Sequence, residues 1–503
     1  MARRREYVSF FGEGRGRHRD FSGFERRGGL MRVLLPALAV AFLAVSIWWF
    51  GFRDADADAG AIVTMDDATI PTLLLPTGAE GAGLEGDASF ECLETSEEWS
   101  MFQGGPGRTG CADTRVITEP RILWKAEVGI QGWLNNAVIG GNSVFVSSAG
   151  VVQFVPDRRD AIYSLDVRTG RQLWYYQAEL DVNGIGYLDG VVVATGDEGR
   201  VWALDARDGE VLWIADFGED DPVYSNPLMI NGMAIVGDGL GNVTAFDIHG
   251  NGDPLWEAQV DGAIRGGASS DGELIFVAGE NHEVLALDMN GREVWRAVVR
   301  GRGQSADLAR IFAAPTIAGD LIIVSLVRPD VYAEPAVVAL HKETGEIAWQ
   351  AIDVAGLKTG DWANLRSSVA VAGDVVVFGE SYSDSLVALD LHTGQTRWSA
   401  KAGSYCLPHW PSPAITGGQV ILPRDDGGLY AISLADQKKV WEIYLGNESG
   451  QSAGTFPAGF DDDFCEDDET GYAILSSPAI TDEGVIIVGT LEGFIYAIGD
   501  RNW

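Results

Sequence analysis

The sequence contains three groups of side chains that could bind a ligand or react with one. Four cysteines, Cys92, Cys111, Cys406 and Cys465, could form disulfides or remain as thiols. Seven of the nine residues in 461–469 are acidic, and carboxylate oxygens are ligands for Ca²⁺. Their spacing differs from that of an EF-hand loop, so a solvated acidic loop is the simpler interpretation. The third group combines aromatic residues with arginine and asparagine in the longer loops, a composition typical of binding surfaces.

Two motifs that carry catalysis in other proteins are absent from the sequence. It has no phosphate-binding glycine loop and no His-Glu-x-x-His. Its six histidines are scattered without metal-ligand spacing. Acidic side chains number 73 against 36 basic ones, which argues against a nucleic-acid-binding protein.

A repeated pattern must position these side chains. Residues 164–174, 203–213 and 388–398 share Asp-x-x-(Thr/Asp)-Gly-x-x-x-Trp, and each repeat has the pattern of four short strands. In one repeat these strands are 184–188, 191–195, 200–204 and 211–215, with Asp189-Gly190 as a hairpin turn. A period near 45 residues built of strands predicts a propeller of four-stranded blades. We expect one tryptophan of each repeat to pack between neighbouring blades: Trp124, Trp174, Trp213, Trp256, Trp295, Trp349, Trp398 and Trp441.

The two ends of the repeat region complement each other. After seven complete repeats, an eighth triplet of strands (477–480, 484–489 and 494–498) lacks a fourth strand. The unmatched segment 122–128 could supply it and remove the open sheet edges. The sequence therefore predicts an all-β, eight-bladed propeller of four-stranded antiparallel blades, the last closed by the first strand. A solenoid is the alternative, but it would leave the last triplet unfinished.

Loop lengths predict two different faces. In an up-and-down blade, loops 1–2 and 3–4 share one face, and here they are short; we call it the plain face. Loops 2–3 and the blade connections share the other, elaborated face, which carries the long segments 147–161, 300–312, 326–336, 353–366, 401–410 and 446–476. Long loops on a rigid scaffold are where binding concentrates. Candidate binding residues at the channel mouth, which could instead plug the channel or pack between blades, are Trp133, Asn135, Tyr224, Asn226, Arg265, Arg310, Trp362, Asn364, Arg366, His409, Trp410 and Tyr472.

The N-terminal region predicts a membrane anchor. Residues 1–32 hold nine arginines against four acids, a charge of +5, and the net charge of the whole chain is -37. Residues 33–52 are uncharged and long enough for one transmembrane helix, with the basic tail in the cytoplasm. Residues 53–89 read as a flexible linker, 90–120 as a pre-propeller segment and 121–503 as the propeller. A cleaved signal peptide ending near 55–57 is the alternative.

The predicted location of the propeller determines whether its cysteines are expected to form disulfides. On the outer side of a bacterial cytoplasmic membrane, disulfides are expected. Cys92 with Cys111 would staple the pre-propeller segment, and Cys406 with Cys465 would join the loops that enter the last two blades. Free thiols are the alternative.

The repeat, and the segment 99–110 (WSMFQGGPGRTG), resemble the pyrroloquinoline-quinone (PQQ) propeller superfamily over residues 99–503. That superfamily includes quinoprotein dehydrogenases and non-enzymatic members such as the outer-membrane-assembly lipoprotein propeller. The dehydrogenases typically carry two adjacent cysteines beside PQQ, and the four cysteines here are never adjacent. The residues that bind calcium and the cofactor in those dehydrogenases cannot be assigned to positions in this sequence.

Together these features predict a membrane-anchored, extracytoplasmic propeller without catalytic residues or cofactor, which binds an envelope protein or surface ligand. The alternative is a PQQ- and calcium-dependent oxidoreductase, or a degenerate PQQ-binding protein. A sensor that passes a signal inward is a third, weaker interpretation.

Overall fold

The computed structural model describes residues 90–94, 98–132, 135–218, 221–299, 310–327, 337–351, 365–380, 384–403, 411–446 and 473–501. These residues belong to one compact unit, Gly86–Trp503. The predicted basic tail, transmembrane segment and linker (1–89) lie outside the described residues. Within the described ranges, no helix has the length and apolar character needed to cross a bilayer.

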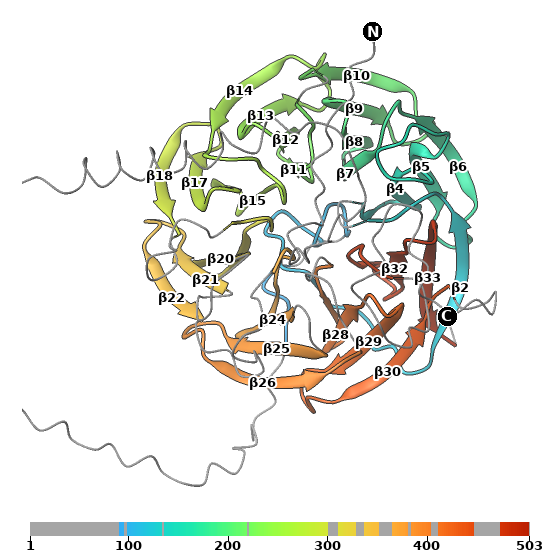
Figure 1. The fold of residues 1–503 in the computed structure, drawn as a ribbon, viewed down its shortest axis with the longest axis vertical. Helices are drawn as coiled ribbons and strands as arrows, with labels where there is room; N and C mark the ends of the chain where they lie inside the picture. The colour runs from blue at the N-terminus through green and yellow to red at the C-terminus, as the bar shows by residue number, and fades with distance from the viewer. Residues whose placement is uncertain are drawn as a thin grey trace, which may run out of the picture. The chain divides into compact units, whose positions relative to one another are not determined.

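The described chain is all-β, and its strands form eight sheets that follow one another around a ring (Figure 1). This confirms the predicted eight-bladed propeller. Blades 1 to 4 contain β3 (Ala137–Gly140), β4 (Ser143–Ala149), β5 (Asp160–Asp166), β6 (Gln172–Gln177); β7 (Val182–Leu188), β8 (Val191–Gly196), β9 (Arg200–Asp205), β10 (Val211–Asp216); β11 (Leu228–Ile230), β12 (Met233–Gly237), β13 (Asn242–Asp247), β14 (Pro254–Gln259); and β15 (Ala268–Ser270), β16 (Leu274–Gly279), β17 (Glu283–Asp288), β18 (Glu293–Val298).

Blades 5 to 8 have the same antiparallel plan. They contain β19 (Thr316–Ala318), β20 (Leu321–Ser325), β21 (Val337–His341), β22 (Ile347–Ala351); β23 (Ala370–Ala372), β24 (Val375–Gly379), β25 (Ser385–Asp390), β26 (Thr396–Lys401); β27 (Ala414–Thr416), β28 (Gln419–Pro423), β29 (Gly428–Ser433), β30 (Lys439–Tyr444); and β31 (Ala479–Ile480), β32 (Ile486–Gly489), β33 (Phe494–Asp500), β2 (Pro120–Glu127). Strand β2 pairs antiparallel with β33, from Pro120 opposite Asp500 to Glu127 opposite Phe494.

Blade 7 differs from the others by a fifth strand. Strand β1 (Cys111–Ala112) pairs in parallel with β27, Cys111 opposite Ile415. Cys92 and Cys111 form a disulfide, as expected from the sequence. The other predicted pair, Cys406 with Cys465, lies outside the described residues, as does the acidic run 461–469.

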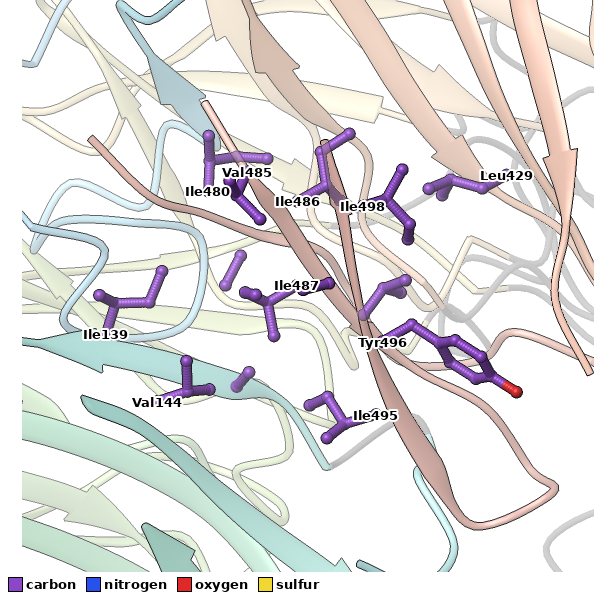
Figure 2. Packing of buried hydrophobic residues seen from close by; sticks show 14 of the residues in the cluster. Ile139, Val144, Leu429, Ile480, Val485, Ile486, Ile487, Ile495, Tyr496 and Ile498 are labelled. Carbon is purple, nitrogen blue, oxygen red and sulfur yellow. The ribbon is translucent and has the colours of Figure 1, made fainter. Parts of the chain in front are cut away.

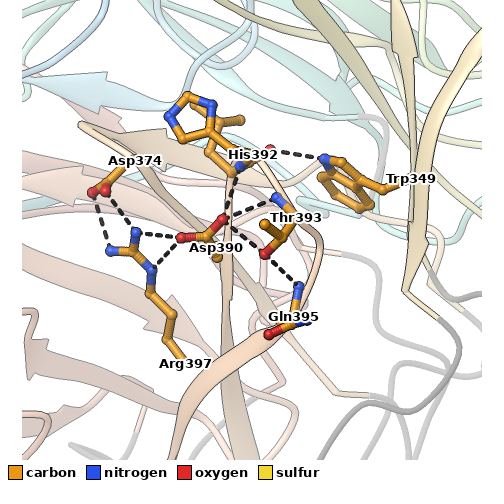
Figure 3. A network of polar contacts seen from close by, with 8 residues as sticks. Trp349, Asp374, Asp390, His392, Thr393, Gln395 and Arg397 are labelled. Atoms are coloured by element: carbon orange, nitrogen blue, oxygen red, sulfur yellow. Dashed lines mark hydrogen bonds and ion pairs between the residues drawn. The ribbon is translucent and has the colours of Figure 1, made fainter. Parts of the chain in front are cut away.

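The repeat motif builds a turn between the third and fourth strands of a blade. In blade 6, Asp390 Oδ1 accepts hydrogen bonds from the backbone nitrogens of His392 and Thr393 at 3.1 and 2.9 Å (Figure 3). The guanidinium of Arg397 joins Asp390 Oδ2 to the carboxylate of Asp374, with 2.6 Å contacts to both. Gly394 completes the turn at a φ of +67°, a conformation that glycine adopts without steric cost.

Six of the eight repeat tryptophans donate a hydrogen bond from the indole nitrogen to a backbone carbonyl outside their own blade, and the indole nitrogen of Trp256 has no such partner. Trp349 Nε1, for example, donates to Leu391 O at 2.8 Å (Figure 3). The same kind of contact to a backbone carbonyl recurs around the ring and holds these indoles against a neighbouring part of the chain. It is made by Trp124 to Val167, Trp174 to Ala206, Trp213 to Ile248, Trp295 to Lys342 and Trp441 to Ile117.

The apolar core is continuous from blade to blade. Ile486, Ile487 and Ile495 of blade 8 lie in one cluster with Val144 of blade 1 and Leu429 of blade 7, and all five are buried (Figure 2). Full burial of such a side chain contributes about 1.5–3 kcal/mol. Because each central strand packs on both faces, the blades form a rigid base for the loops.

Candidate binding site at the channel mouth

Six of the twelve candidate binding residues lie outside the described residues: Trp133, Trp362, Asn364, His409, Trp410 and Tyr472. The other six are Asn135, Tyr224, Asn226, Arg265, Arg310 and Arg366. These six side chains lie in several different kinds of surroundings.

Two of the asparagines make contacts between blades. Asn135 Nδ2 donates to Val182 O of blade 2 at 2.6 Å, and its Oδ1 accepts from Gly132 N at 3.1 Å. Asn226 Oδ1 accepts from Asn136 Nδ2 at 3.5 Å, and its backbone forms a parallel bridge with Gly267. Both side chains are buried. The Asn135 side chain joins the neighbouring blades 1 and 2, and the Asn226 side chain joins the start of blade 3 to Asn136 at the start of blade 1.

Three other candidates are linked by contacts between arginines and aromatic rings. The guanidinium carbon of Arg265 lies 4.6 Å from the ring centre of Tyr224 and 5.8 Å from that of Phe312. Arg366 approaches the same Phe312 ring at 5.0 Å. We call Tyr224, Arg265, Phe312 and Arg366 the mouth cluster. A cation and the face of an aromatic ring attract each other, and here two guanidinium groups lie against the ring of Phe312.

Charge in the mouth cluster is partly balanced. Arg265 Nε and Nη2 both lie 3.1 Å from Glu280 Oε2. Burial raises the pKa of Tyr224 to about 12, with Asp197 adding to the shift and Arg265 opposing it. The phenol therefore stays protonated near neutral pH. Arg310 is held differently, since its backbone nitrogen and carbonyl each bond to Val327 at 2.8 Å.

Carboxylates lie beside this cluster, between blades 1 and 2. Asp160 Oδ2 accepts from Asp157 N at 2.6 Å, Asp181 Oδ2 from Phe154 N at 2.9 Å, and Asp197 Oδ1 from Asn183 Nδ2 at 2.8 Å. Burial raises the pKa of Asp160 to about 7, with the neighbouring Asp157 and Asp197 charges adding to the shift. Burial also raises the pKa of Asp181 and of Asp197. The described residues contain no group of three or more metal-ligating side chains that could hold an ion.

A second surface lies on the rim, where sequence reasoning placed no site. Leu173 and Tyr175 on β6, and Leu212 and Ile214 on β10, are 42–52% exposed. We call these four residues the blade 1–2 rim. They flank Trp174 and Trp213, one position before and one after. In the other six repeats the position after the tryptophan is polar: Lys125, Glu257, Arg296, Gln350, Ser399 and Glu442. An apolar residue directly after the tryptophan therefore marks this surface in the sequence.

Fold and repeat together define the class of protein, an eight-bladed propeller of PQQ-like repeats. The profile of the family described as "Outer membrane protein assembly factor BamB" matches residues 115–268, 241–406 and 333–458. These matches span more than half of the chain, and the chain belongs to this family.

Curated relatives and solved structures agree with this assignment. BamB of Burkholderia pseudomallei is 23% identical over 316 residues, covering 58% of this chain and 77% of the relative. The crystal structure of BamB from Moraxella catarrhalis is similar with a TM-score of 0.54 at 15% identity, covering 76% of this chain and 98% of that one. A europium-containing methanol dehydrogenase is similar with a TM-score of 0.55 at 14% identity, covering 80% and 98%. At these identities the two structures show a shared fold alone.

Proposed function

We propose that this protein is a non-enzymatic scaffold of the cell envelope that binds another envelope protein, in a role like that of the BamB relatives in outer membrane protein assembly. Its family membership supports the class of function. The observation that carries the proposal is the blade 1–2 rim, because exposed apolar side chains clustered on a soluble surface mark sites of interaction. Burying four such side chains would supply several kcal/mol, at about 1.5–3 kcal/mol each when fully buried.

The elaborated face adds to this surface. Val151 and Val155, in the loop between β4 and β5, are about half exposed, and Leu240 between β12 and β13 is 63% exposed. The partner would therefore contact the rim of blades 1 and 2 and the loops above it. Candidate loop residues outside the described ranges remain part of this proposed surface.

We further propose that residues 33–52 anchor the chain in the cytoplasmic membrane, with 1–32 inside, 53–89 as a tether and the propeller outside. The sequence patterns of charge and hydropathy support this arrangement. Alkaline phosphatase fusions after residue 89 and after residue 25 would test it. Activity of the first fusion alone is expected, and activity of neither would contradict the topology.

Affinity capture with cross-linking from the full-length protein in detergent tests the binding surface. Tyr175→Glu with Ile214→Glu gives blades 1 and 2 the residue type found at Glu257 and Glu442 of other blades. We expect the cross-linked envelope protein to decrease at least about 10-fold, the effect of 1.4 kcal/mol. Leu255→Ser with Val294→Ser is the matched control, since both residues are also about half exposed but lie on blades 3 and 4. Equal capture by the rim variant and the wild type would refute this surface.

A quinoprotein function is the second candidate, supported by the shared fold with the methanol dehydrogenase. Titration of the purified protein with PQQ and Ca²⁺, followed by absorbance and dye reduction, separates the two. We expect no saturable change at micromolar PQQ; a saturable change would favour the quinoprotein.

A further inference from the structure

The segment before the first blade crosses the end of the channel at the plain face. In Figure 1 it is the blue trace near the centre of the ring. Its carbonyl oxygens accept hydrogen bonds from the inner strands of six blades. These bonds are Ile139 N to Trp99 O (2.7 Å), Tyr187 N to Ser100 O (2.8 Å), Ser270 N to Pro106 O (2.9 Å), Ile317 N to Gly107 O (2.8 Å), Val371 N to Thr109 O (2.8 Å) and Ile415 N to Gly110 O (2.7 Å).

The donors identify the face. Ile139, Tyr187 and Ile317 each stand within two residues of the turn that joins the first and second strands of their blade. Those turns belong to the plain face. The segment 99–110 therefore covers the channel there, opposite the mouth cluster.

Arg108 fixes this segment from within. It is fully buried, and Nε donates to Ala268 O of blade 4 at 3.0 Å. Its Nη2 donates to Asn226 O and Pro227 O beside blade 3 at 3.2 and 3.0 Å, and Nη1 to Phe102 O at 2.8 Å. Blade 3, which donates none of the six backbone bonds, is thus held by the arginine. Hydrogen bonds from a charged donor are about twice as strong as neutral ones.

A carboxylate folds the segment tightly on itself. Both oxygens of Glu94 accept from Gly107 N, at 3.2 and 3.1 Å. A Cβ on Gly105 or on Gly107 would lie 2.8 Å from a Glu94 oxygen, so a larger residue at either position would displace the Glu94 carboxylate. The aromatic and apolar side chains of Trp99, Met101 and Phe102 are buried beneath the segment.

The Cys92–Cys111 disulfide closes this segment into a loop. The two residues are 19 positions apart, and Cys111 belongs to β1, which is bonded to blade 7. On the other side, Glu91 O accepts from Gly373 N of blade 6 at 2.8 Å. The loop is therefore held at both ends, and a closed loop of this length has far fewer open conformations than a free chain.

We propose that residues 98–111, tied to Cys92 by the disulfide, form a cap over the plain end of the ring, and that reduction of Cys92–Cys111 by a dithiol releases it. The dithiol supplies two electrons and two protons, the S–S bond breaks, two thiols form on the protein, and the dithiol becomes a disulfide. The cap is independent of the proposed partner surface on blades 1 and 2.

Hydrogen exchange of the full-length protein tests the cap. A Cys406→Ser, Cys465→Ser background leaves Cys92 and Cys111 as the reducible pair. After reduction, we expect the amides of Ile139, Tyr187, Ile317 and Val371 to exchange about 100-fold faster, the factor expected from loop closure over ~20 residues. Outer-strand amides, such as those of Trp174 and Trp213, serve as the internal control and should not change.

Trypsin provides a second readout. Arg108 is inaccessible in the capped structure, so cleavage after it should occur only once the cap is released. Unchanged exchange together with a resistant Arg108 would overturn the proposal. Equal acceleration of cap-bonded and outer-strand amides would also overturn it, because the disulfide would then stabilise the whole fold and not a separate cap. The Cys92→Ser, Cys111→Ser variant should match the reduced protein in both measurements.

Discussion

The indole of Trp349 lies directly against Gly394. A Cβ built on Gly394 would lie 2.4 Å from Trp349 Cε3, which is closer than two non-bonded carbon atoms can approach. The two residues come from different repeats: Trp349 ends the motif of blade 5, and Gly394 belongs to the turn of blade 6. The same relationship joins Trp124 to Gly170 at 2.4 Å. The motif therefore reflects a contact between successive repeats. The tryptophan of one repeat leaves no room for a side chain at the turn position of the next, so that position is glycine.

Gly394→Ala should destabilise the propeller by about 2–5 kcal/mol. A left-handed backbone costs a residue with a Cβ about 1–2 kcal/mol, and overpacking against the indole adds about 1–3 kcal/mol. Urea unfolding followed by tryptophan fluorescence measures the loss. Gly190→Ala is the matched control, since Gly190 has a φ of +81° but nothing within 4 Å of its Cβ position. Equal losses in the two variants would show that the indole contact contributes nothing.

Gln437→Gly should have the opposite effect. Blade 7 is the one repeat in which the glycine is replaced, and Gln437 adopts a φ of 59°. Glycine would remove the backbone cost of about 1–2 kcal/mol and add unfolded-state entropy of about 0.4–1 kcal/mol. We expect a net gain of up to about 1 kcal/mol, seen as a higher urea midpoint with an unchanged slope. A lower midpoint would mean that the Gln437 side chain makes a stabilising contact.

These contacts explain why the sequence predicts the fold well and the site poorly. Trp174 and Gly209 leave a periodic signal because packing between blades demands those residue types. Asn135 leaves none, because its partner is the Val182 carbonyl, 47 residues away, and a buried asparagine has the same identity as a binding one. The cap is bonded through backbone carbonyls, which any residue supplies. In the sequence it is marked by Cys92, Cys111 and the resemblance of residues 99–110 to the segment that precedes related propellers.

Stability should depend on pH through the carboxylates between blades 1 and 2. The pKa of Asp160 is raised from the usual value of about 4 to about 7, so the native state binds its proton more tightly than the unfolded state does. Its contribution to stability is full below about pH 4 and is lost as pH rises towards 7, at about 1.4 kcal/mol per pH unit for one proton. Unfolding free energies of wild type and Asp160→Asn between pH 4 and 8 test this, and the variant should lose less stability over the range.

Asp374→Asn is the control for that series, with the opposite sign. Hydrogen bonds from Arg397 lower the pKa of Asp374, so its contribution is present above about pH 4 and is lost as pH falls below that. The Asp374→Asn variant should therefore keep the wild-type slope between pH 5 and 8 and differ from it in acid. If Asp160→Asn and wild type run parallel from pH 4 to 8, the Asp160 carboxyl is not protonated in the native state near neutral pH.

Trp124→Ala tests the junction between the two ends of the chain. Trp124 lies on β2, which pairs with β33, while its indole bonds to Val167 O of blade 1 at 2.9 Å and packs on Gly170. One side chain therefore links blade 8 to blade 1, and its loss should cost about 3–5 kcal/mol. Trp398→Ala is the matched control, because Trp398 occupies the same repeat position but is only partly buried and precedes the blade whose turn has Gln437. Thermal unfolding should show a clearly larger decrease in Tm for Trp124→Ala. Equal decreases would mean that the junction of blades 8 and 1 is no more demanding than any other junction in the ring.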